Sequence, residues 1–78
     1  MSDRTDLERL AGQERQLVSA VADFEHQIRR IRERLERGGG RSFALETELR
    51  QVEKNLDLCR RELRPVRAQL GRRRIERG

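Results

Sequence analysis

Large apolar residues recur along the chain in alternating steps of three and four positions, interrupted by three consecutive glycines. Before the glycines, this apolar stripe contains Leu7, Leu10, Leu17, Val21, Phe24, Ile28, Ile31 and Leu35. After them it contains Leu45, Leu49, Val52, Leu56, Cys59, Leu63, Val66 and Leu70. Such spacing places the residues on one face of an α-helix, and its persistence over several heptads is typical of a coiled coil. The pattern predicts two long helices joined by a glycine turn.

The first helix is expected to span residues 5–37. Thr5 is followed by Glu8, which is the spacing of an N-terminal capping box. Residues 1–4 would then form a short tail. Gly38 is expected to end the helix as a C′ glycine, because glycine readily adopts the left-handed conformation that is common at this position.

Residues 38–41 are expected to form the turn, and residues 42–76 the second helix. Ser42 can cap this helix with its hydroxyl oxygen. Pro65 lies inside it and costs about 3 kcal/mol in a regular helix, because it lacks an amide hydrogen and crowds the preceding turn. The apolar stripe keeps its phase across Pro65, so we expect a kink there, with a complete break as the alternative. Arginines make the C-terminal end of this helix basic.

Folding the chain back at the glycines brings the two halves of the stripe together in a defined register. Residues equally distant from Gly40 then face each other: Leu35 and Leu45, Ile28 and Val52, Val21 and Cys59, Leu10 and Leu70. Glu14 is the polar interruption of the stripe and falls opposite Val66. A lone polar residue at such a position lowers stability but disfavours slipped alignments.

The distribution of charge supports the same pairing. Residues 1–26 carry three Arg and six acids, a net charge of −3, and residues 58–78 carry eight Arg and two acids, a net charge of +6. Residues 27–41 carry six Arg and two acids (+4), and residues 42–57 carry two bases and four acids (−2). Each segment therefore lies against one of opposite charge. The expected fold class is all-α, an antiparallel two-helix coiled-coil hairpin.

Two helices alone bury little apolar surface. The chain has 78 residues, of which 33% are hydrophobic and 42% charged, and small domains bury a low fraction of their surface. Ala11 and Val18 widen the stripe of the first helix. We therefore expect further burial by association, as a homodimer that forms a four-helix bundle or by docking on a larger helical protein, with a monomer as the third alternative.

The residue pattern favours a binding module over an enzyme. No nucleophile, base and orienting group are expected to meet, since His26 falls on the outer face and Cys59 in the stripe. A single cysteine cannot form an internal disulfide, no Cys/His spacing predicts a metal site, and no cofactor is expected. We expect a non-enzymatic interaction or assembly module. Its candidate interaction residues are those of the apolar stripe, apart from Leu7 and Val66.

The arginine content is the basis for an alternative prediction, that the chain is a small nucleic-acid-binding regulator. The chain has 18 Arg and a net charge of +5, although a GC-rich genome also produces such a bias. The residues best placed to contact phosphate are Arg67, Arg72, Arg73 and Arg74. No aromatic residue accompanies them to stack on bases, so this function is less favoured.

The sequence gives no indication of a membrane segment. Residues 1–6 are polar and acidic, and no apolar run approaches the roughly 18 residues that a spanning helix needs. We therefore expect a cytoplasmic protein without membrane contact.

Overall fold

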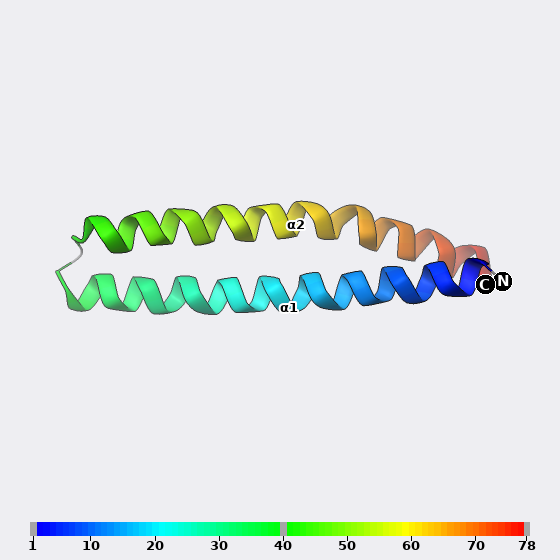
Figure 1. Cartoon of the computed structure of the whole chain (residues 1–78), viewed down its shortest axis with the longest axis horizontal. Helices are drawn as coiled ribbons and strands as arrows, with labels where there is room; N and C mark the ends of the chain where they lie inside the picture. The colour runs from blue at the N-terminus through cyan, green and yellow to red at the C-terminus, as the bar shows by residue number, and fades with distance from the viewer. Residues whose placement is uncertain (1, 40, 78) are drawn as a thin grey trace.

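The chain forms a hairpin of two long helices in the computed structural model (Figure 1). The structure describes residues 2–39 and 41–77, with side chains over residues 4–39 and 41–73. Helix α1 spans Ser2–Arg37 and helix α2 spans Phe43–Arg77. The molecule measures 57 × 17 × 14 Å, and its long dimension matches a single helix of this length at about 1.5 Å per residue. The expected all-α helical hairpin is confirmed.

The apolar stripe forms the contact between α1 and α2. Ile28, Ile31, Val52 and Leu56 are buried at its centre. Other members of the stripe pack against them: Val21, Phe24, Leu35, Leu45 and Leu49. This core joins residues that lie at equal distances from the turn, as the predicted register requires. Leu10, Leu63 and Leu70 are buried toward the open end of the hairpin.

Gly39 has the left-handed conformation at the turn, with a φ angle of 86°. The amide of Gly38 donates to the carbonyl oxygen of Arg34 at 3.0 Å, and the amide of Gly39 donates to that of Glu36 at 3.3 Å. The expectation that Gly38 would be the left-handed glycine is therefore wrong by one residue, because helical hydrogen bonding extends to the Gly38 amide. Gly40, which the sequence placed in the turn, lies outside the described residues.

Ser42 caps α2 as predicted. Its Oγ accepts a hydrogen bond from the amide of Leu45 at 3.3 Å, and its carbonyl oxygen accepts one from the amide of Glu46 at 2.9 Å. The hydroxyl thus satisfies an amide that has no partner within the helix. Helix α2 begins directly after this residue.

Helix α1 begins at Ser2, so the predicted capping box at Thr5 and the tail at residues 1–4 are wrong. Thr5 lies inside the helix. Glu8 Oε1 is instead 3.6 Å from Arg4 Nε, the i,i+4 pairing that stabilises a continuous helix. Glu8, which was expected to cap the helix at Thr5, therefore forms an ion pair within the first turns of α1 instead.

Helix α2 is continuous through Pro65, so the alternative of a complete break is wrong. Pro65 is exposed, which keeps its ring away from the core. In Figure 1 the C-terminal part of α2, coloured orange to red, curves toward α1. Leu70, beyond the proline, is only 2% exposed. The apolar contact between the helices therefore extends past Pro65.

Gly39→Ala is expected to lower the free energy of unfolding by about 1–2 kcal/mol, because a Cβ disfavours the left-handed conformation. Gly38→Ala is the matched control. Its added Cβ would lie 3.4 Å from the carbonyl oxygen of Arg34, and alanine is favoured over glycine in helices by about 0.8–1 kcal/mol. Thermal unfolding followed by circular dichroism measures both variants. Equal destabilisation would contradict the placement of the left-handed residue.

Ile31→Ala is expected to destabilise the hairpin by about 2–5 kcal/mol, because it removes a buried side chain from the core. Ile31 is 5% exposed, whereas Leu58 is 47% exposed. Leu58→Ala, the control, should change stability by less than about 0.5 kcal/mol. Urea unfolding provides the comparison, and similar losses in the two variants would show that the assigned core is incorrect.

Candidate functional site

Ion pairs between α1 and α2 follow the charge distribution of the sequence. Toward the open end, acids of α1 pair with arginines of α2, whereas nearer the turn an arginine of α1 pairs with an acid of α2. The pairs among the described residues are Asp6–Arg73 at 3.5 Å, Glu14–Arg67 at 3.4 Å, Glu25–Arg60 at 3.9 Å and Arg32–Glu53 at 3.9 Å. The attraction expected between the paired segments is therefore present as direct contacts.

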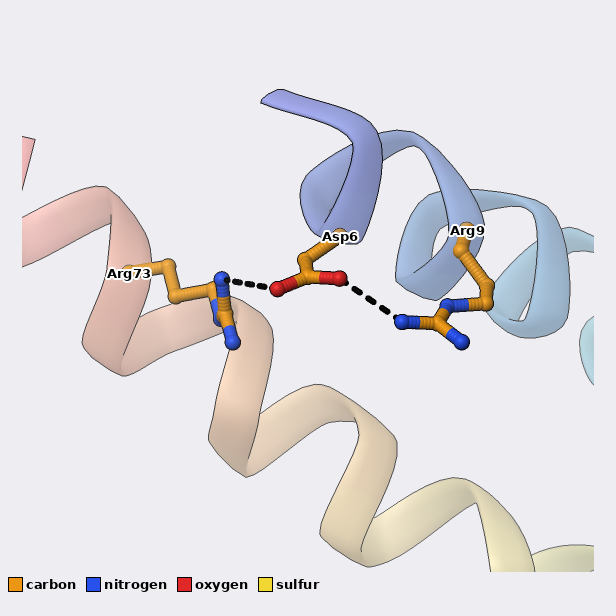
Figure 2. A network of polar contacts seen from close by, with 3 residues as sticks. All are labelled: Asp6, Arg9 and Arg73. Carbon is orange, nitrogen blue, oxygen red and sulfur yellow. Dashed lines mark hydrogen bonds and ion pairs between the residues drawn. The ribbon is translucent and has the colours of Figure 1, made fainter. Parts of the chain in front are cut away.

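Asp6, near the start of α1, contacts Arg73, near the end of α2 (Figure 2). Its Oδ1 is 2.7 Å from Arg9 Nη2 on the same helix, and its Oδ2 is 3.5 Å from Arg73 Nη1 on α2. Asp6 and Arg73 are 30% and 35% exposed in their side chains. Sequence reasoning missed this contact. The available signal was that Arg73 lies three residues after Leu70, in phase with the apolar stripe and opposite Leu7.

Glu14, the polar interruption of the stripe, has a partner in Arg67. Its Oε2 lies 3.4 Å from Arg67 Nε, and its side chain is better covered than that of the arginine. Arg67 directly follows Val66, the residue expected opposite Glu14, so its guanidinium reaches the carboxylate from the side of the core. This pairing reduces the cost of placing a charged group beside apolar residues.

Two of the four arginines predicted to contact phosphate are therefore engaged with acids of α1, namely Arg67 and Arg73. Arg72 is exposed. The side chain of Arg74 lies outside the described residues. Successive helical residues are about 100° apart around the axis, so neighbours in this basic sequence face different directions.

An open groove follows one side of the hairpin between α1 and α2. Toward the open end of the hairpin it is lined by Val18, Val21, Ala22 and Leu63. Toward the turn it is lined by Ile28, Leu56 and charged residues. Glu25 and Arg60 line both parts and form an ion pair at 3.9 Å where the two parts meet. We call this surface the flank groove; its apolar member Val18 is 42% exposed.

The described part of the chain shows neither a cluster of metal ligands nor a helix that could span a membrane. No three His, Cys, Asp or Glu side chains within it are grouped as metal ligands would be. His26 is exposed and Cys59 is half-buried. Neither described helix combines the length and the apolar character needed to cross a membrane.

Comparison of the chain with known protein families, curated proteins and solved structures finds no match. The surface of the hairpin therefore provides the basis for a functional proposal.

A double-mutant cycle on Asp6→Asn and Arg73→Gln is expected to give a coupling energy of about 0.2–1 kcal/mol, the usual range for partly exposed ion pairs. The coupling should shrink in 1 M salt, where the Debye length falls to about 3 Å. Thermal unfolding of the four proteins provides the measurement. The control cycle pairs Asp6→Asn with Arg50→Gln, since Arg50 is an exposed residue near the turn. Equal coupling in both cycles would contradict a specific contact.

Proposed function

We propose that the chain is a non-enzymatic assembly module whose apolar stripe and flank groove bind a further pair of helices. The observation that carries this proposal is the incomplete cover of the stripe. Seven of its 16 members are buried and the other nine are only half-buried. More than half of the stripe thus keeps apolar surface in contact with water, and of these half-buried members Val21 lines the flank groove beside the exposed Val18.

Burial of this remaining surface would provide the driving force for association, at about 25 cal/mol per Å² removed from water. A second helix pair crossing at about 20° would cover the groove and give a four-helix bundle with coiled-coil packing. We favour a homodimer, because two-fold homo-oligomers are the commonest closed assemblies. A larger helical protein is the other candidate partner. A cytoplasmic location stays a prediction from the polar sequence.

Nucleic-acid binding is the less favoured function. It depends on guanidinium groups that are available to phosphate, and Arg73 is held by Asp6 with only 35% of its side chain exposed. The two proposed functions would also differ in how binding depends on salt. Binding to phosphates weakens steeply as salt is added, whereas apolar association persists.

Val18→Asp is expected to abolish association, because it places a charge in the apolar part of the groove. Sedimentation equilibrium at micromolar concentration should give twice the chain mass of 9.3 kDa for the unaltered protein and a monomer for this variant. Leu58→Asp is the matched control, since Leu58 is also about half exposed but does not line the flank groove. A helical monomer for the unaltered protein would exclude the homodimer.

A further inference from the structure

We infer that the flank groove binds a second copy of this chain, with the turn end of each copy against the open end of the other. The inference rests on the proposed assembly function and specifies its partner, its surface and its orientation. In this arrangement α1 packs on α1 and α2 on α2 of the second copy, each pair antiparallel. The two-fold axis lies between the two copies, perpendicular to the helices, at the level of Arg60.

The face of α2 along the groove is complementary to itself about Arg60. On one side of Arg60 the groove is lined by Glu53 and Asp57, and on the other by Arg64 and Arg67. Arg60 lies midway between Glu53 and Arg67. A two-fold axis at Arg60 therefore places Glu53 and Asp57 of each copy against Arg67 and Arg64 of the other, and all four contacts join opposite charges.

The face of α1 is complementary about the same level. The register of the hairpin places Ala20 opposite Arg60, because both are 20 residues from Gly40. An axis at Ala20 brings Val18 of each copy onto Ala22 of the other, so the apolar part of the groove covers itself. Arg15 lies seven residues before Ala22 and hence near the same face, since a helix drifts only about 20° per heptad. It would meet Glu25 of the second copy.

The net charges of the two parts of the groove select this orientation. Apart from the shared Glu25 and Arg60, the part near the turn has four acids and two arginines, a net charge of −2, and the other part has two arginines, a net charge of +2. Docking turn end on turn end would oppose like charges. The axis brings Arg60 of one copy close to Arg60 of the other. Glu25 of the same chain lies 3.9 Å from each Arg60 and compensates its charge.

Paired charge reversals test the orientation. The first variant carries Arg64→Glu with Arg67→Glu, and the second carries Glu53→Arg with Asp57→Arg. Each variant alone opposes like charges at every α2 contact, so its dimer dissociation constant should rise at least about tenfold. An equimolar mixture restores opposite charges at every contact and should form a heterodimer of the unaltered affinity. Each variant also loses ion pairs within its own hairpin, so circular dichroism must show that it is still helical before sedimentation measures its association.

Glu48→Arg with Glu62→Arg is the control for the second variant, because it makes the same change of charge outside the groove lining. It should dimerise like the unaltered protein. A monomeric unaltered protein would overturn both the homodimer and this inference. A dimer that tolerates both reversals, or variants whose mixture stays monomeric, would overturn the inference alone and leave the assembly function in place.

Cross-linking provides a second test without charge reversal. In a Cys59→Ser background, Arg60→Cys places one thiol per chain beside the two-fold axis, where mild oxidation should give a covalent dimer. Arg50→Cys, ten residues toward the turn and outside the groove lining, would place its two thiols about 30 Å apart at a rise of about 1.5 Å per residue. Disulfides require Cα atoms within about 7 Å, so this variant should not cross-link. Equal cross-linking at the two positions would contradict the axis.

Discussion

The packing of one half of the apolar stripe on the other is the interaction on which the rest of the structure depends. Ile28, Ile31, Val52 and Leu56 fix the register of the two helices, and the register decides which charged residues become neighbours. Because the side-chain ion pairs are largely exposed, each contributes little by itself. The ion pairs form because the apolar contact brings these residues together. They also disfavour alignments in which one helix is shifted along the other.

Much of the fold could be predicted because its strongest signal is periodic. The stripe depends on side-chain size and spacing, and both are visible in the sequence. Helix ends depend on competition between local contacts. Glu8 could cap Thr5 or pair with Arg4, and it pairs with Arg4. Three adjacent glycines offer equivalent chemistry, so the sequence alone could not distinguish Gly39 from Gly38 as the left-handed residue.

The candidate surface was predictable only in part. Val18 stood out in the sequence because it widens the stripe, and it lines the flank groove. The groove itself was missed, because it combines side chains of both helices and depends on how completely each residue is covered. The arginines illustrate the reverse case. Arg67 and Arg73 belong to one basic stretch of sequence, but the register brings each of them to an acid of α1.

Apolar burial and charge have different roles in a molecule of this shape. Burial drives association but has no preferred direction, and a long hairpin with a continuous stripe offers several alignments of similar apolar area. Charged residues beside the stripe distinguish these alignments, because an alignment that brings like charges face to face is unfavourable. Within the hairpin this applies to Glu25 and Arg60. In the proposed dimer, the same rule would make the order of acids and arginines on α2 a determinant of how the two copies meet.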